Sequence, residues 1–161
     1  MRTPLVIKFA VLNSLLLLIW LSGEYMLGFQ DKFITAFPVL NMASLIIPVV
    51  CVWLLLRQIK SENDGMLTYQ RAFLSGLLFT IMSAVLVIPV RYIFSHYINP
   101  EYADNLLKSI IAVTGQQTGG KLQFSFSEGP FLLMEAIYTF SAGTFATLVF
   151  SFTMKTTKLT L

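Results

Sequence analysis

The stretch Ala72–Phe94 reads AFLSGLLFTIMSAVLVIPVRYIF and decides the class of fold. It exceeds the roughly 20 residues that an α-helix needs to cross the hydrocarbon core of a bilayer. Arg91 is its only charged residue. A surface helix of a soluble protein exposes a polar face to water, and this stretch has no polar face. It is therefore predicted to be a transmembrane helix.

Three further apolar segments, Leu5–Leu21, Phe37–Leu56 and Phe131–Phe152, have similar lengths. Charged residues make up only 12% of the chain, about half the share of an ordinary soluble domain. The sequence thus predicts an all-α integral membrane protein, a single membrane domain over residues 1–161 folded as an antiparallel four-helix bundle. The four transmembrane helices are expected at about residues 5–22, 37–56, 70–97 and 130–153.

Basic residues predict the orientation, because Lys and Arg concentrate in cytoplasmic loops. Seven flank the termini and the second loop, and three lie in the first and third loops. The seven are Arg2, Lys8, Arg57, Lys60, Arg71, Lys155 and Lys158, and the three are Lys32, Lys108 and Lys121. Glu24 is expected in the first, outer loop. We expect a multi-pass protein of the bacterial inner (cytoplasmic) membrane with both termini cytoplasmic.

The connections differ in kind. The second loop has a polar turn ending in Gly65, which can adopt positive φ, and Thr68 is predicted to cap the next helix. The third loop, residues 98–129 and predicted to be periplasmic, is the longest. Within it Asn99-Pro100-Glu101 is the start of a helix predicted to end at Val113. Its apolar residues recur at helical spacing. They are Ala103, Leu106, Leu107, Ile110 and Ile111. This short amphipathic helix is expected either to lie on the membrane surface or to cap the bundle.

Arg91 and Glu135 are the ionisable residues inside the third and fourth predicted helices. Charges at membrane depth are costly, so they pair or line a cavity. If the third helix ends near Tyr97 and the fourth begins near Gly129, both lie about 9 Å inside, at a rise of about 1.5 Å per residue. Because these helices are antiparallel, Arg91 and Glu135 form a candidate intramembrane polar pair. The pair either locks the two helices or belongs to a substrate or proton site.

Small residues on the same two helices favour close approach of their backbones. The predicted faces are Gly76, Thr80, Ala84 and Arg91 on one helix, and Glu135, Thr139, Ala142 and Ala146 on the other. Elsewhere, Asn13, Ser14 and Asn41 are expected to form hydrogen bonds between helices.

Two prolines lie inside predicted helices. Pro48 should free the carbonyl of Ser44, and Pro89 that of Val85. Such breaks can mark ligand sites in transporters, but they are also common in purely structural membrane helices, which is the interpretation we favour.

Several classes of function are disfavoured by the sequence. The basic residues flank apolar segments rather than forming a stripe, so no nucleic-acid partner is expected. With His96 as the only histidine, a histidine-rich metal site cannot be built. No catalytic constellation is recognisable, so we predict no catalytic residues, no metal or cofactor site and no enzymatic activity.

The central part of the chain resembles a known family. Gly65–Phe73 (GMLTYQRAF), then Gly76 and Tyr92, and finally Tyr97–Tyr102 (YINPEY) are similar to a bacterial membrane family of unknown function, number 4199 in the domain-of-unknown-function series. The resemblance implies four membrane helices and an inner-membrane location in Gram-negative bacteria, and it transfers no role to any residue.

These observations favour a non-enzymatic scaffold or accessory subunit whose surroundings are the lipid bilayer and an unidentified membrane-protein partner. The alternative is a small transporter or lipid-binding protein that uses Arg91 and Glu135. A membrane enzyme ranks last. A transporter needs a polar cavity open to one side at Arg91, whereas a scaffold needs none.

Overall fold

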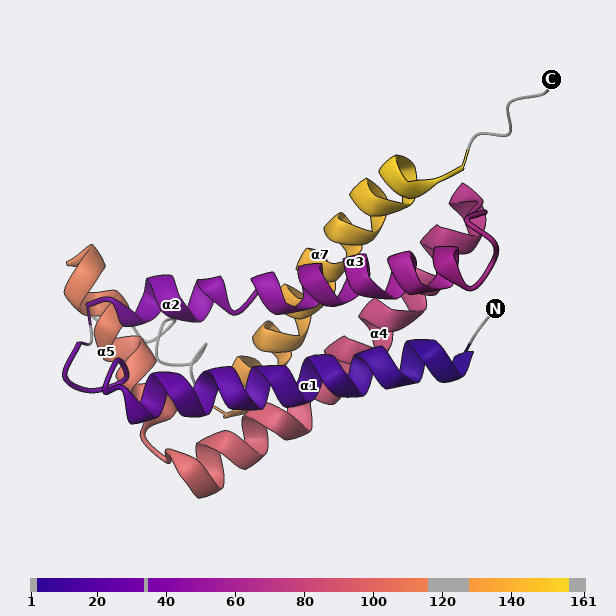
Figure 1. Cartoon of the computed structure of the whole chain (residues 1–161). Coiled ribbons are helices and arrows are strands. Elements are labelled where there is room, and N and C mark those ends of the chain that lie inside the picture. Colours follow the sequence, from indigo (N-terminus) through magenta and orange to yellow (C-terminus); the bar gives the residue numbers. More distant parts are fainter. Residues whose placement is uncertain (1–2, 34, 116–127, 157–161) are drawn as a thin grey trace.

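A computed structural model describes residues 3–33, 35–115 and 128–156, and within these ranges the regular structure is helical with no strand (Figure 1). Four helices are long and apolar enough to cross a membrane. They are Thr3–Met26, Phe37–Ser61, Tyr69–Ile98 and Gly129–Met154. The predicted fold class, an all-α membrane bundle of four spans, is therefore confirmed.

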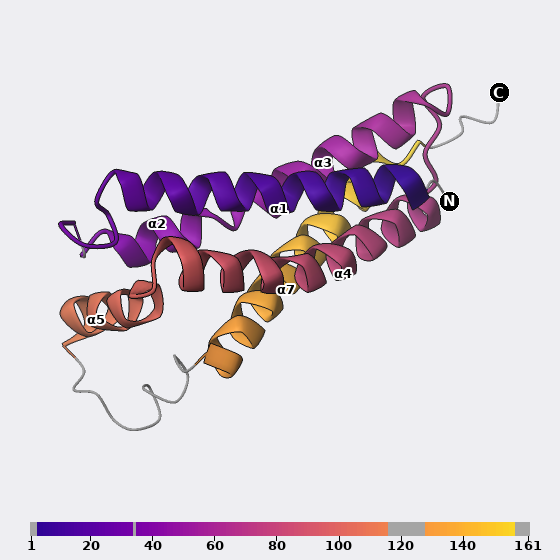
Figure 2. The ribbon, with the colours of Figure 1, turned by 90° about the horizontal axis from the view of Figure 1, so that it is seen from below.

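The spans run antiparallel in chain order, as Figures 1 and 2 show. Helix α1 (Thr3–Met26) is followed by α2 (Phe37–Ala43) and α3 (Ile46–Ser61), which together form the second span. Helices α4 (Tyr69–Ile93) and α7 (Glu128–Met154) form the third and fourth. The described segments nearest both termini lie at one end, the termini end, and α5 (Tyr102–Thr114) lies at the other, the α5 end.

The second span is interrupted, where a continuous helix over 37–56 was expected. Residues Ser44 and Leu45 form a turn between α2 and α3. Pro48 has no N–H to donate to the Ser44 carbonyl, which accepts instead from the N–H of Ile47 at 3.0 Å. The freed carbonyl is thus satisfied locally.

Helix α1 continues past its predicted end at residue 22 to Met26. Glu24, expected in the outer loop, is consequently helical and only 5% exposed. The chain then reverses at Gly28, whose φ of 77° is a left-handed conformation that suits glycine. This reversal returns Gln30 to the end of α1, where its Nε2 donates to the carbonyl of Leu21 at 3.3 Å.

At the termini end, the predicted turn and cap are present. Gly65 has a φ of 77°, and Thr68 Oγ1 accepts from the N–H of Arg71 at 3.3 Å. The sequence did not predict that the chain end binds this turn. The N–H of Thr156 donates to the carbonyl of Leu67 at 2.8 Å, and the Leu67 N–H donates back to Thr156 Oγ1 at 3.1 Å.

At the α5 end, α4 leads into a π-helical turn, η1 (Phe94–Ile98). Asn99 follows and was expected to cap α5 directly. Its Oδ1 instead accepts from the N–H of Glu101 at 3.2 Å, within a turn that precedes the first helical residue, Tyr102. Pro100 belongs to this turn, so α5 begins later than predicted.

Helix α5 buries one face against the end of the bundle. That face consists of Tyr102, Asn105, Leu106 and Ser109, and Leu106 belongs to a core cluster that includes Leu21 and Phe131. The face therefore caps the bundle, which favours one of the two alternatives left open by the sequence.

Helices α4 and α7 make the most extensive helix contact. A Cβ built on Gly76 would lie 2.5 Å from Thr147 Cγ2, and one built on Gly143 would lie 2.8 Å from Thr80 Oγ1. The contact is thus reciprocal, one glycine from each helix facing a threonine of the other. Gly76 and Thr80 were predicted for this face. On α7 the residues in contact are Gly143 and Thr147 rather than Ala142, whereas Glu135, Thr139 and Ala146 of the predicted face are buried.

The outer surface of the bundle is apolar. Val39, Phe145, Ile19 and Val85 are each more than 60% exposed. Such residues would be an aggregation hazard in water, but lipid chains cover them favourably. Polar side chains lie inside, at the site described next.

Candidate functional site

The two charged residues predicted to pair are in contact. Arg91 lies in the last turn of α4, and its Nη2 is 2.7 Å from Oε2 of Glu135 on α7. Their side chains are only 2% and 5% exposed. A buried ion pair needs further hydrogen bonds to offset the loss of hydration, and Arg91 has them.

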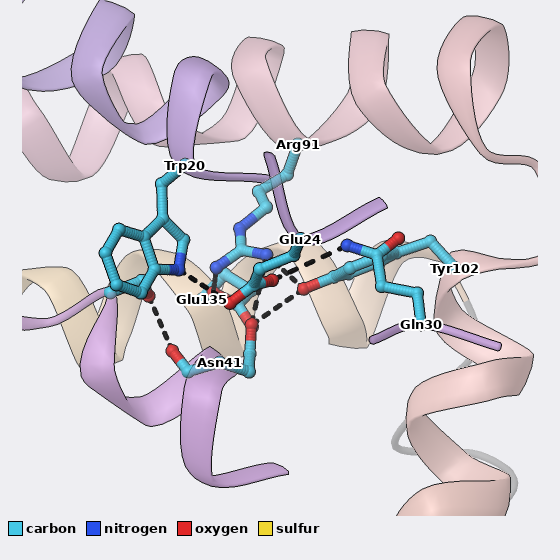
Figure 3. Close-up of polar contacts among 8 residues, drawn as sticks. Trp20, Glu24, Gln30, Asn41, Arg91, Tyr102 and Glu135 are labelled. Carbon is cyan, nitrogen blue, oxygen red and sulfur yellow. Dashed lines mark hydrogen bonds and ion pairs between the residues drawn. The ribbon is translucent and has the colours of Figure 1, made fainter. Parts of the chain in front are cut away.

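Nη1 of Arg91 makes those further contacts with α2 and α5. It donates to the hydroxyl of Tyr102 and to Oδ1 of Asn41, the latter at 3.4 Å. The Tyr102 hydroxyl in turn donates to Asn41 Oδ1 at 2.7 Å. The predicted interhelical hydrogen bond of Asn41 is therefore present. Arg91 links α2, α4, α5 and α7 through direct contacts (Figure 3).

Aromatic packing holds Tyr102 in position. Its ring meets Phe37 and Phe94 edge to face, with centroids 5.5 and 5.3 Å apart, and tilts against Phe131 at 5.8 Å. Burial raises the pKa of the Tyr102 hydroxyl, against the opposing effect of Arg91. The hydroxyl therefore keeps the proton that it donates to Asn41.

A second carboxyl group, Glu24, lies beside this pair. Its Oε1 accepts from Trp20 Nε1 at 2.6 Å, and its Oε2 accepts from Gln30 Nε2 at 3.5 Å. Asn99 Nδ2 donates to Gln30 Oε1 at 2.7 Å and connects this branch to the turn before α5. Among the described residues, Glu24 has no cation within ion-pair distance, although Arg91 acts on it electrostatically.

We call this set the polar cluster, and Figure 3 shows the side chains of all its members but Asn99 directed toward one another. Its members are Trp20, Glu24, Gln30, Asn41, Arg91, Asn99, Tyr102 and Glu135.

The sequence identified Arg91, Glu135 and Asn41 and missed the rest. The spacing of Trp20 and Glu24, one helical turn apart, could have placed both on one face if α1 had been expected to continue. Ser14 was predicted to bond to another helix, but its Oγ donates to the carbonyl of Ala10 in its own helix at 3.0 Å.

A small cavity adjoins the polar cluster inside the bundle. About 10 Å³ is open to the centre of a water molecule, which is about the space that one water needs. Arg91 and Glu135 line it together with polar and apolar residues of the first, second and fourth spans. These are Asn13, Leu17, Ser44, Leu45, Ile47, Pro48 and Thr139.

The chemistry available at the cluster is limited. Glu135 is tied to Arg91, and Glu24 accepts two hydrogen bonds, so both carboxyl groups are already engaged. Within the described residues, no three His, Cys, Asp or Glu side chains gather where they could hold a metal. His96 lies outside the cluster, exposed and stacked on Tyr92 with ring centroids 4.2 Å apart. The cluster can hold helices together, and the cavity that adjoins it among the described residues has room for about one water molecule.

A family model described as "Protein of unknown function (DUF4199)" matches residues 8–156. No curated protein and no solved structure matches the chain.

Proposed function

The chain belongs to the DUF4199 family, whose description assigns no activity. From the geometry of the polar cluster, we propose that it is a non-enzymatic membrane protein that acts as a scaffold or accessory subunit. In this proposal the polar cluster sets the shape of the bundle, and the lipid-facing surface meets a partner membrane protein.

The enclosure of Arg91 carries the proposal. A transporter binds its cargo in a cavity near the middle of the membrane that opens to one side. Here the guanidinium group is 2% exposed, it contacts three side chains of the chain itself, and the adjoining cavity has room for about one water molecule. These features support a structural role over the alternative, a transporter or lipid-binding protein that uses Arg91 and Glu135.

In this proposal an apolar groove between α4 and α7 is the contact surface for the partner membrane protein. It faces outward and is formed by Ile81, Ala84, Val85, Ile88, Ala136, Ile137 and Phe140. Ala84 and Ala136 are small, so another apolar chain could approach closely there.

We further propose that the protein resides in the inner membrane of a Gram-negative bacterium with both termini cytoplasmic. The uneven distribution of basic residues supports this orientation. A periplasm-active reporter should be silent when fused after Leu161 and active when inserted near Thr118. The reverse pattern would exclude the orientation and leave the proposed role untouched.

The decisive experiment tests whether the groove on the lipid-facing surface contacts a partner, and then whether this contact needs the charges of the polar cluster. A photocrosslinking residue is placed at Ile81 or Ile137 in the groove, or at Ile19 on α1 as a control, in the full chain in its native membrane. All three positions are about half exposed or more. We expect an adduct of one defined mass from the groove and none from Ile19.

The same experiment is then repeated in the double variant Arg91→Met/Glu135→Gln, which removes both buried charges together. A scaffold should keep its adduct and should still reverse any growth defect of a strain lacking the gene. If the double variant folds and keeps its adduct but loses that activity, the charges serve a cargo and the scaffold proposal is wrong.

A further inference from the structure

Two buried polar atoms beside the Arg91–Glu135 pair have no hydrogen-bond partner among the residues that the structure describes. They are Nε of Arg91 and Oδ1 of Asn13, and both residues are 2% exposed. Buried polar groups in folded proteins are almost always satisfied, by the protein or by ordered water. The Nε–H is part of a buried cation, for which an unmet hydrogen bond is especially unfavourable.

The two residues line the same space. Asn13 and Arg91 both line the small cavity between the first, second and fourth spans. Their needs are complementary, because Arg91 Nε carries a hydrogen to donate and Asn13 Oδ1 can only accept. A single group that accepts from one and donates to the other would satisfy both.

We propose that one internal water molecule binds in this cavity and bridges Arg91 Nε to Asn13 Oδ1. Its oxygen accepts the Nε–H, and one of its hydrogens is donated to Asn13. Ser44, which also lines the cavity, uses its hydroxyl hydrogen on the carbonyl of Asn41 at 2.6 Å and retains lone pairs for the second water hydrogen. Three polar partners are the usual number for a buried water molecule.

Size and charge exclude other occupants. The space open to the centre of a water molecule, about 10 Å³, holds about one water and is too small for an organic ligand. The guanidinium group of Arg91 repels a metal cation, and the carboxylate of Glu135 repels an anion such as chloride. A neutral molecule that both donates and accepts is the one that fits.

The water gives Arg91 a contact that the direct hydrogen bonds lack. Nη1 and Nη2 reach α2, α5 and α7, and Nε would reach α1 through the water. With the water bound, each of the three guanidinium nitrogens would donate a hydrogen bond to an acceptor. This inference concerns the interior of the bundle and stands apart from the proposed function.

Solid-state NMR of the full chain in lipid bilayers tests the proposal directly. The chain has four arginines, and Arg91 is the buried one among the described Arg57, Arg71 and Arg91, so its Nε–H can be assigned in arginine-labelled protein. We expect magnetisation transfer from a bound water to the Arg91 Nε–H. The wild-type chain alone decides the matter, because absence of this transfer would overturn the proposal.

Two variants then locate the water. Asn13→Leu fills the cavity with an apolar side chain and should abolish the transfer to Arg91. Ser14→Ala removes a neighbouring buried hydroxyl that bonds within its own helix and does not line the cavity, so transfer should persist. Undiminished transfer in a folded Asn13→Leu variant would place the water elsewhere and refute the bridge.

Should Asn13→Leu not fold, a high-resolution structure of the wild-type chain in lipid tests the same bridge. Water density within hydrogen-bond distance of both atoms supports the bridge, and absence of this density refutes it.

Discussion

Different interactions hold the helices together at the two ends of the bundle. At the α5 end, the polar cluster joins α2, α4, α5 and α7 through the bonds of one buried cation, and Gln30 ties Glu24 of α1 to Asn99 before α5. Toward the termini end, α4 and α7 touch through Gly76 and Gly143, each facing a threonine of the other helix. Lipid supplies no hydrophobic force between helices, so a membrane bundle has hydrogen bonds and close packing to rely on. In this chain buried side-chain hydrogen bonds gather at the α5 end, and the closest helix packing lies between α4 and α7.

The largest effect is expected where a single charge would be left alone. Glu135→Gln should lower the free energy of unfolding by about 3 kcal/mol, because it strands a buried guanidinium without its carboxylate. Reversible denaturation in mixed micelles measures this. Adding Arg91→Met should cost less than the sum of the two single changes, with a coupling of at least about 0.6 kcal/mol.

Glu24→Gln is the matched control for that change. Glu24 is as buried as Glu135 but has no cation within ion-pair distance among the described residues. A glutamine there keeps an oxygen for Trp20, so the loss should be below about 1 kcal/mol. Equal losses for the two glutamates would show that burial, rather than the ion pair, sets the stability of the α5 end.

The next effect tests the close-packed end. Gly76→Ala should destabilise the bundle by about 2 kcal/mol, because the added Cβ overlaps Thr147 and must separate α4 from α7. Gly76→Ala combined with Thr147→Ala should recover much of the loss. The control is Gly23→Ala on α1, where a Cβ meets nothing within 4 Å. This change should be neutral or slightly stabilising, because alanine favours helix. A neutral Gly76→Ala would mean that packing does not hold this end.

A smaller effect comes from the hydroxyl of Tyr102. Tyr102→Phe keeps the aromatic contacts and removes the bonds to Arg91 and Asn41, at a cost of about 1 kcal/mol near neutral pH. Burial raises the pKa of Tyr102 in the folded state. Above about pH 10 the unfolded chain therefore loses this proton while the folded chain keeps it, and stability falls. The difference between wild type and variant should shrink as pH rises past about 10. A constant difference would argue against a buried, protonated hydroxyl.

The smallest effect concerns the chain end. Thr156→Val removes the acceptor of the Leu67 N–H and the donor to the Gly65 carbonyl, while the backbone bond to Leu67 can remain. Because Thr156 is exposed, the loss should be about 0.5 kcal/mol. Hydrogen exchange at the Leu67 amide should accelerate while exchange at the α5 end stays unchanged. Acceleration at both ends would indicate that the two ends are not independent.

Local properties of the chain explain what could be predicted. Span length and hydropathy decide whether a helix crosses a bilayer, and neither depends on the partners of that helix. The depths of Arg91 and Glu135 follow from the rise per residue, which is why their proximity could be expected before any contact was known. The cap at Thr68 and the turn at Gly65 are also decided within a few residues.

The rest of the site depends on rotation and on chain reversal, which local patterns do not encode. Glu24 enters the bundle because α1 continues to Met26, and Gln30 joins it because the chain turns back at Gly28. Which residues of α7 meet Gly76 and Thr80, namely Gly143 and Thr147, is decided by how two whole helices cross. The sequence by itself therefore determined four membrane spans and the depth of two charges. Only the tertiary structure decided which side chains surround Arg91, because that requires five helices and their connections to be placed together.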